Sequence, residues 1–291
     1  MEKNMKTKGV LSVVLASFLY GIMPIFTKMA LREGLSNSAY VFNRFFMSAV
    51  FSLLLCIMTK RNMKVSPTRL LQMTVIGIIG YGLTGMFLTI SYTRIPVGLA
   101  TMFHFTNPMI ITVAMIVIFK DKPTKFKIIS TVVALLGLFL MADFSRLDFL
   151  GVVYAMLSGV TYAVYVIANK KSELRNIDNF VVVFYISAIN TVFFGVKNVV
   201  GGEFAFCPTL KSWLLLAFIG LFCTVAALAL LTYGIRVLGA SNAAMINLLE
   251  PIISLISGVI VYGDIISAKA MCGCAAVVIA GVLTAMDSGK E

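Results

Sequence analysis

Long apolar runs separated by short polar breaks fill the whole chain. A bilayer core about 30 Å thick needs roughly 20 apolar residues in one helix, and ten runs reach about that length. The expected membrane-spanning helices are Gly9–Leu31, Ala39–Thr59, Leu70–Tyr92, Val97–Phe119, Phe126–Ala142, Phe149–Asn169, Phe180–Val200, Trp213–Tyr233, Ala240–Tyr262 and Ala270–Met286. The longest break, residues 201–212, is too short for a soluble domain. We therefore expect an all-α integral membrane protein with ten transmembrane helices.

Composition and charge agree with a lipid environment. The 291 residues are 60% hydrophobic and 12% charged, whereas soluble domains are about half apolar. The formal net charge of +12 first suggests nucleic acid as a partner. However, the Lys and Arg residues stand in short groups between the apolar runs, as in Lys60-Arg61-Asn62-Met63-Lys64. This pattern is typical of membrane-protein loops, so we exclude nucleic acid and expect the lipid bilayer as the surrounding partner.

The distribution of Lys and Arg predicts the orientation. With the N-terminus inside, sixteen of them fall in inside segments, seven fall in outside segments, and Arg44 lies within a span. Positive residues concentrate on the cytoplasmic side, so we expect both termini in the cytoplasm of a cell with the protein in its plasma or inner membrane. The first apolar run is too long for a signal-peptide core and is expected to remain as the first span.

The sequence predicts no cofactor and no metal. Four of the five cysteines lie in apolar runs, where Cys acts as a small apolar residue, and only Cys207 lies in a polar stretch. His104 is the single histidine, and the Asp and Glu residues are scattered between the apolar runs. Such a distribution does not form a dedicated ligand set for a metal ion.

The two halves of the chain repeat each other. Setting Gly9 on Gly151 places Tyr20 on Tyr162, and Ile76-Gly77 then falls near Ile219-Gly220. The best match pairs the segment from Ala100-Thr101-Met102 to Asn107-Pro108 with the segment from Ala243-Ala244-Met245 to Glu250-Pro251. Each half contains five spans, and an odd number makes the second half enter the membrane from the opposite side. We expect two inverted five-helix repeats over residues 1–145 and 146–291.

Motifs on the fourth span of each half carry a family resemblance. In the first half they are Tyr92-Thr93-Arg94-Ile95-Pro96-Val97-Gly98-Leu99-Ala100, Asn107-Pro108 and Phe119-Lys120-Asp121; in the second they are Tyr233-Gly234-Ile235-Arg236-Val237-Leu238-Gly239-Ala240, Glu250-Pro251 and Tyr262-Gly263-Asp264. With the inverted repeats, they resemble the drug/metabolite transporter superfamily, specifically its EamA-type ten-helix permeases and exporters. The family usually has Gly-Glu where this chain has Lys120-Asp121 and Gly263-Asp264, so the carboxylate is shortened by one carbon. The resemblance implies a transporter of small organic solutes without fixing the solute.

Inverted repeats also predict a mechanism. Two similar bundles of opposite topology can exchange conformations, so a solute held between them near the midplane faces each side in turn. We expect the fourth and ninth spans to lie near the pseudo-two-fold axis and to face a central cavity. Pro108 and Pro251 in these spans free the carbonyl groups of His104 and Asn247, four residues earlier. Either these free carbonyl groups bind the solute, or the two prolines only bend their helices around neighbouring helices.

Glu250 is the candidate for carrying a proton. It lies about ten residues from either end of the expected ninth span, where a carboxylate is costly unless it faces a partner or a water-filled cavity. The alternative is a neutral acid bonded to a neighbouring helix. His104 with Asn107 and Asn247 with Glu250 form two related pairs, because residues three apart share one helical face. This symmetry favours a place for His104 in the cavity. The alternative is that His104 is a packed and hydrogen-bonded residue.

Further side chains could line the path of the solute. Tyr20, Tyr81, Tyr162 and Tyr165 are expected at mid-depth, where each offers a ring and a hydroxyl group, with core packing as the alternative. Arg44 lies near the outer end of the second span. It is either a side chain that reaches the lipid headgroups, which we favour, or a cation that attracts a carboxylate-bearing solute.

Small residues predict close helix packing. Cys272, Ala276 and Ala280 recur at every fourth position of the last span, which suits packing within the chain or dimerisation. We expect a monomer or a weak homodimer.

These residues together favour a secondary active transporter without enzymatic activity. Its small-molecule substrate would be an amino acid, a related metabolite or an amphipathic drug, and coupling to protons is expected through Glu250. An uncoupled facilitator or channel is the main alternative, because its pore-lining residues would look similar. An intramembrane protease is a remote alternative, since only Gly239-Ala240-Ser241-Asn242 resembles a Gly-x-Ser motif.

Overall fold

The computed structural model describes residues 2–118, 120, 125–141, 148–171, 177–238, 246–247 and 249–288, and all regular structure in these residues is helical. The elements are α1 (Glu2–Arg32), α2 (Asn37–Met58), α3 (Pro67–Val75), η1 (Ile76–Gly82), α4 (Leu83–Tyr92), α5 (Val97–His104), α6 (Asn107–Val117), α7 (Lys125–Met141), α8 (Phe149–Lys171), α9 (Asn179–Val200), α10 (Leu210–Phe218), η3 (Ile219–Ala226), α11 (Ala227–Leu238), α13 (Leu249–Tyr262) and α14 (Ala268–Ser288). Among these residues, five helices are long and apolar enough to cross a membrane, and five shorter apolar helices lie at the other expected spans. The all-α membrane fold expected from the sequence is confirmed.

Several helices begin where a polar side chain follows a break in the apolar pattern. The Ser36 hydroxyl accepts a hydrogen bond from the Ala39 N–H at 3.1 Å, and Ser66 caps α3 in the same way. Asp178 caps α9, and Thr209 forms a reciprocal capping box with Ser212 at α10. Such caps satisfy amide groups that have no partner within the helix, so the short polar breaks end one span and start the next.

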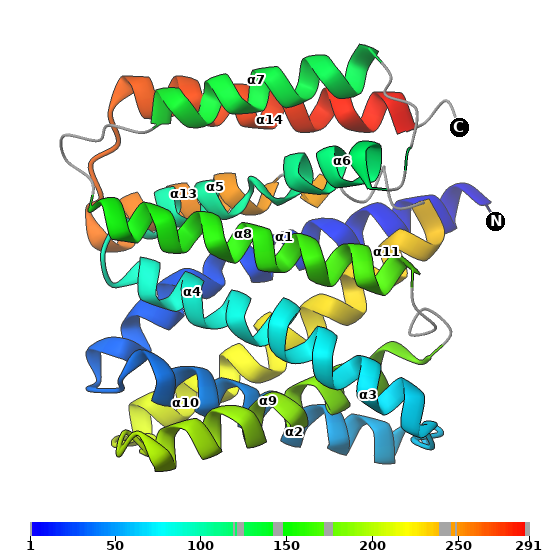
Figure 1. Ribbon diagram of the computed structural model, residues 1–291, viewed down its shortest axis with the longest axis vertical. Coiled ribbons are helices and arrows are strands. Elements are labelled where there is room, and N and C mark those ends of the chain that lie inside the picture. The colour runs from blue at the N-terminus through cyan, green and yellow to red at the C-terminus, as the bar shows by residue number, and fades with distance from the viewer. Residues whose placement is uncertain are drawn as a thin grey trace.

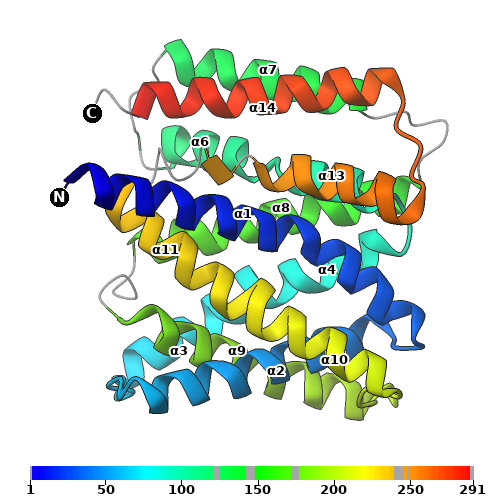
Figure 2. The same cartoon turned by 180° about the vertical axis from the view of Figure 1, so that it is seen from behind.

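The helices form layers that join the two halves of the chain (Figures 1 and 2). The pair α7 and α14 lies at one end, and α2 packs against α9 at the other. Between them, α1 packs against α11 and α13, while α8 packs against α4, η1, α5 and α6. Each helix of the first half therefore packs mainly on helices of the second half, and the interface between the repeats runs through the interior.

Small residues allow two pairs of helices, α1 with α13 and α7 with α14, to pack closely. A Cβ atom on Gly21 of α1 would lie only 2.9 Å from the Glu250 carbonyl oxygen on α13. At the α7–α14 contact, a Cβ atom on Gly137 would lie 2.9 Å from the Ala276 methyl group. Ala276, from the small-residue stripe of the last span, thus packs within the chain, whereas Cys272 is exposed.

The third span of each half contains a π-helical segment at the matching position. In the first half this segment is η1, and in the second half it is η3. They begin at Ile76 and Ile219, the two positions that the internal repeat sets side by side. Short π-helical insertions are rare and often lie at functional sites, so both halves preserve an irregularity that hydropathy alone does not predict.

Two helix ends also repeat in backbone conformation although their residues differ. Lys60 after α2 and Gly202 after α9 have positive φ angles of 51° and 67°. The Arg61 N–H donates to the Cys56 carbonyl at 2.9 Å, and the Glu203 N–H donates to the Asn198 carbonyl at 2.8 Å. Both are the bonds of a left-handed helix cap, so lysine takes the conformation that glycine adopts more readily.

The fourth span is interrupted, which corrects the expectation of one continuous helix. Helix α5 ends at His104, residues 105–106 form a turn, and α6 begins at Asn107. Pro108 therefore lies in the first turn of a new helix, where its missing N–H has no carbonyl partner to lose. In the second half, Ile246 and Asn247 are helical, residue 248 lies outside the described residues, and the described part of α13 runs from Leu249, so it includes Glu250 and Pro251.

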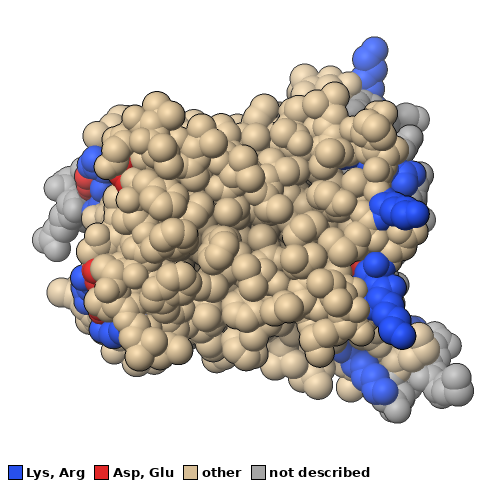
Figure 3. Space-filling model, turned by 90° about the horizontal axis from the view of Figure 1, so that it is seen from below, with Lys and Arg blue, Asp and Glu red and all other residues tan. Residues whose placement is uncertain are grey.

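Charged residues gather at two opposite edges of the helical body (Figure 3). At one edge Lys and Arg predominate, and at the other they alternate with Asp and Glu, with a broad uncharged surface between. Helix α1 begins and α14 ends at the first edge, and the loops after α1 and α4 lie at the second (Figure 1). We name these the basic edge and the mixed edge. The uncharged belt between them is the surface that faces lipid in a membrane protein.

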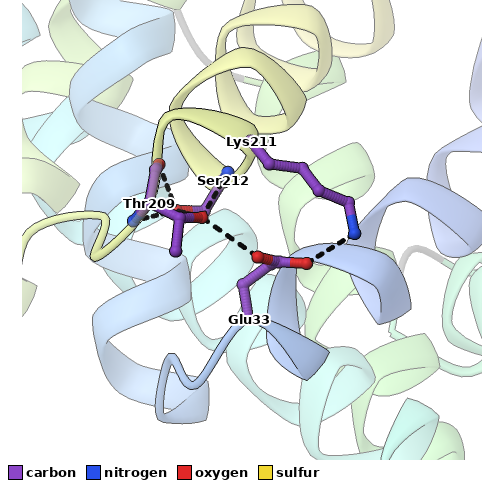
Figure 4. A network of polar contacts seen from close by, with 4 residues as sticks. All are labelled: Glu33, Thr209, Lys211 and Ser212. Atoms are coloured by element: carbon purple, nitrogen blue, oxygen red, sulfur yellow. Dashed lines mark hydrogen bonds and ion pairs between the residues drawn. The ribbon is translucent and has the colours of Figure 1, made fainter.

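Ion pairs at the mixed edge join the two halves. Lys211 Nζ lies 2.6 Å from Glu33 Oε1, and the Thr209 hydroxyl donates to Glu33 Oε2 at 3.0 Å (Figure 4). The hydrogen bond from Lys211 holds the pKa of Glu33 below its usual value. Arg94 Nη1 lies 2.7 Å from Asp148 Oδ2, and its hydrogen bond likewise lowers the pKa of that carboxyl group. Each pair connects opposite repeats, because Lys211 belongs to α10 and Asp148 directly precedes α8, whereas Glu33 and Arg94 follow α1 and α4.

Candidate functional site

The structure places Glu250 on α13 at its contact with α1. The Asn247 side-chain amide donates to Glu250 Oε2 at 3.2 Å, and the Ser17 hydroxyl donates to Asn247 Oδ1 at 3.0 Å. Glu250 is half-buried. The carboxyl group therefore lies at the contact between the repeats, where the Asn247 amide offsets part of the cost of its negative charge.

The corresponding segment of the first half has a related arrangement. The Asn107 side-chain amide donates to the His104 carbonyl oxygen at 3.0 Å, so the carbonyl group released at the break has a partner within the chain. His104 Nδ1 lies 2.9 Å from the Ser158 hydroxyl of α8, and this hydroxyl also lies 2.6 Å from the Ala155 carbonyl oxygen. A carbonyl oxygen can only accept, so the Ser158 proton points to Ala155 and His104 donates from Nδ1. Neutral His104 then keeps Nε2 as an acceptor.

The first helix of each repeat, α1 or α8, thus contributes a serine to the polar group of the other repeat. Ser17 on α1 bonds the Asn247–Glu250 pair, and Ser158 on α8 bonds His104. Sequence reasoning missed both serines, because a serine in an apolar run gives no signal of its own. The fourth and ninth spans also meet directly, with Thr101 Oγ1 3.0 Å from Ser254 Oγ.

The four tyrosines expected at the site lie together. The ring centroids of Tyr81 and Tyr165 are 5.3 Å apart, those of Tyr162 and Tyr165 are 6.0 Å apart, and the His104 ring lies 5.3 Å from Tyr162. Tyr20 completes the group, since it interacts electrostatically with the other three tyrosines and with Glu250. Aromatic faces and hydroxyl groups from both halves therefore surround the carboxyl group.

Arg44 does not reach toward lipid headgroups, so the interpretation that we favoured from the sequence is wrong. Its side chain is only 7% exposed and lies inside the helical body. The guanidinium group is in electrostatic range of Tyr40, Tyr81, Tyr92 and Cys223. Sequence reasoning did not select Tyr40 or Tyr92, because both lie at helix ends, where tyrosine usually marks the membrane interface.

The remaining candidate residues are a possible metal-ligand set, Pro251, and residues that lie outside the described part of the chain. Among the described residues, no group of three or more His, Cys, Asp or Glu side chains could hold a metal ion. Pro251 is buried in α13. Ser241 of the Gly-x-Ser motif, Asp121, and the expected repeat boundary at residues 145 and 146 lie outside the described residues.

Ten apolar helical segments in two inverted five-helix repeats, with polar and aromatic side chains between the repeats, define the architecture of a multi-pass membrane transporter. The chain matches the EamA-like transporter family over residues 7–142 and again over residues 149–286, and it belongs to this family. The resemblance to EamA-type transporters stated from the sequence is confirmed, and transport of small solutes across a membrane follows from the family.

Two further comparisons agree with this placement. An uncharacterized transporter of Clostridium kluyveri is 21% identical over 303 residues, which cover 97% of this chain and 94% of the relative. A protein of known crystal structure shares the fold with a TM-score of 0.69 at 14% identity, covering 94% of this chain and 96% of the other. The similarity therefore extends over nearly the whole chain in each comparison.

Proposed function

We propose that the protein is a proton-coupled secondary active transporter that moves a small organic solute by alternating access. The observation that carries the proposal is the position of Glu250, a carboxyl group between the repeats that is bonded to Asn247 and surrounded by tyrosines. Coupling needs a group that gains and loses a proton where the solute binds, and Glu250 is the carboxyl group that meets this need among the described residues.

The groups around Glu250 come from several helices. Tyr20 of α1, Tyr92 of α4 and Tyr162 of α8 all interact electrostatically with it. The charge of Glu250 therefore acts on hydroxyl groups that come from both repeats. A solute that binds one protonation state more tightly is linked to the proton, because coupling is a differential affinity and is reciprocal.

Alternating access is supported by the way the repeats pack. Each repeat contributes a broken or π-helical segment to the interior, and ion pairs such as Glu33–Lys211 connect the repeats at the mixed edge. In this proposal the mixed edge faces outward and the basic edge faces the cytoplasm. Both termini then lie in the cytoplasm of a cell whose plasma or inner membrane holds the protein, as the positive-inside rule expects.

The experiment compares the wild type with Glu250→Gln in proteoliposomes. Solutes are first selected by a thermal-shift screen of amino acids, related metabolites and amphipathic drugs on purified protein, since a bound solute raises the unfolding temperature. Uptake is then measured under an imposed pH gradient, together with solute exchange without a gradient. Glutamine imitates the neutral acid at nearly constant volume, so we expect exchange to persist and accumulation driven by the pH gradient to be lost.

Glu203→Gln is the matched control, because Glu203 is an exposed carboxylate in the loop after α9. It pairs with Lys197 at 3.8 Å. The Glu203→Gln variant should accumulate solute as the wild type does. Unchanged accumulation in Glu250→Gln would make Glu250 a structural acid and leave an uncoupled facilitator as the better account. A wild type that equilibrates solute without accumulating it would also contradict proton coupling.

A further inference from the structure

Arg44 is a buried charge that proton coupling at Glu250 does not explain. Its side chain is 7% exposed, its Nε atom has no hydrogen-bond partner, and among the described carboxylates none lies within ion-pairing distance of it. A charged side chain inside a membrane protein is costly and usually pairs with another group. A guanidinium group also cannot give up its proton to avoid the cost.

The surroundings of Arg44 offer polarity without negative charge. Tyr40, Tyr81, Tyr92 and Cys223 are the groups in electrostatic range. The Phe45 ring centroid lies 5.7 Å from the guanidinium carbon, which supplies only a weak cation–π contact. Neutral hydroxyl groups and one ring do not compensate a full positive charge.

The space beside the guanidinium group is kept free of an α4 side chain. Residue 85 is glycine, and the position that a Cβ atom would take there lies 3.7 Å from Arg44 Nη1. A larger residue at this position would extend toward the guanidinium nitrogens. Glycine at this position therefore places no side chain of α4 against the guanidinium group.

Arg44 also shares its tyrosines with the Glu250 site. Tyr92 interacts electrostatically with both Arg44 and Glu250, and Tyr81 interacts with both Arg44 and Tyr20. Tyr92 additionally contacts Thr101 of α5, with 3.4 Å between the hydroxyl oxygens. Tyr92 is therefore in electrostatic range of both the buried cation and the candidate proton carrier.

We propose that Arg44 binds the carboxylate group of the transported solute. The planar guanidinium fork matches a carboxylate through two parallel hydrogen bonds, and a bound carboxylate supplies the missing negative charge. The proposal rests on the proposed transport function and narrows it to carboxylate-bearing solutes, such as amino acids and organic acids. Cationic amphipathic drugs are then excluded, because they would bring a second positive charge to the same site.

The test measures the unfolding temperature of purified protein with three probes that share the 3-methylbutyl chain of leucine. Leucine carries a carboxylate and an ammonium group, 4-methylpentanoate carries only the carboxylate, and isoamylamine carries only the ammonium group. The wild type is compared with Arg44→Gln and Arg44→Lys. Arg94→Gln is the matched control, because it removes an exposed guanidinium group at the mixed edge.

We expect both carboxylate probes, and not isoamylamine, to raise the unfolding temperature of the wild type. In Arg44→Gln the apparent affinity should fall by at least about tenfold, since a charge-assisted pair is lost. The apparent affinity of Arg44→Lys should lie between those of the wild type and Arg44→Gln, and that of Arg94→Gln should equal the wild-type value. Without any probe, Arg44→Gln should unfold at a higher temperature, because an uncompensated buried charge has been removed.

Several outcomes would overturn the proposal: no stabilisation of the wild type by either carboxylate, stabilisation by isoamylamine alone, or equal affinities in Arg44→Gln and the wild type. A lower unfolding temperature of Arg44→Gln without probes would assign the residue a structural role. Glu250→Gln should still bind both carboxylates while losing accumulation. Failure of proton coupling and failure of carboxylate binding are therefore separate results.

Discussion

At the scale of single residues, the site depends on hydroxyl groups that bridge helices of opposite repeats. The Ser17 hydroxyl bonds Asn247 and the Ser158 hydroxyl bonds His104, each across the contact between the repeats. An unsatisfied polar group costs more in lipid than in a wet protein interior, because no water can replace the missing partner. These serines therefore fix the orientation of Asn247 and His104. That orientation determines which groups of the solute the two side chains can bind.

Replacing Ser158 with Ala tests the bond to His104. The change leaves the His104 Nδ1–H without a partner, and a buried unsatisfied donor costs about 1–3 kcal/mol. We expect a lower unfolding temperature of the purified protein and weaker binding of any stabilising solute, because the ring is free to rotate. Ser52→Ala is the control, since Ser52 is buried but its hydroxyl bonds only carbonyl groups of its own helix. Equal effects of both variants would contradict the assigned role of Ser158.

At the scale of elements, the repeats keep backbone shape more strictly than residue type. The π-helical segments η1 and η3 occupy matching places, as do the left-handed positions Lys60 and Gly202, and Lys120 and Gly263. A lysine in this conformation brings its Cβ atom close to the backbone and costs about 1–2 kcal/mol, whereas glycine avoids the strain. The geometry of the turn is therefore a property of the repeat, and the first half accepts strain to adopt it.

Exchanging residues between the halves measures that strain. Lys60→Gly should stabilise the protein by about 1 kcal/mol, and Gly202→Lys should destabilise it by a similar amount. Thermal unfolding in detergent gives both values. Lys64→Gly is the control, because it removes a nearby positive charge at a position without a positive φ angle. A stability of Lys60→Gly at or below that of the wild type would show that the turn is not strained.

At the scale of the whole molecule, exposed charge lies at two opposite edges, and the surface between them in Figure 3 is uncharged. The basic edge carries the start of α1 and the end of α14, and the mixed edge carries the pairs Glu33–Lys211 and Arg94–Asp148 (Figures 1 and 3). Lys and Arg residues are retained on the cytoplasmic side during insertion, so the edge where they predominate is expected to face the cytoplasm. This asymmetry supports the proposed orientation.

A reporter fused after Glu291 tests the orientation. We expect activity from a reporter that functions only in the cytoplasm and none from one that functions only outside. A second fusion at residue 203, in the loop after α9, should give the opposite pattern, because seven spans, an odd number, separate it from the N-terminus. An externally active reporter at the C-terminus would reverse the assignment of both edges.

Much of the fold could be predicted from the sequence because membrane-spanning segments must be long and apolar. The ten spans, the internal repeat and the grouping of Lys and Arg all appear as one-dimensional patterns. The repeat also placed Tyr20 and Tyr162 in matching positions, and both lie near Glu250. These features follow from local composition and from the symmetry of the two halves.

Only the tertiary structure decided which faces of the helices meet. A helix in lipid is apolar on every side, so hydropathy does not distinguish the face toward lipid from the face toward another helix. For this reason the burial of Arg44, the contacts of Ser17 and Ser158, and the break after His104 were not readable from the sequence. The sequence by itself determined the spans and their symmetry, and helix packing between the repeats decided the site.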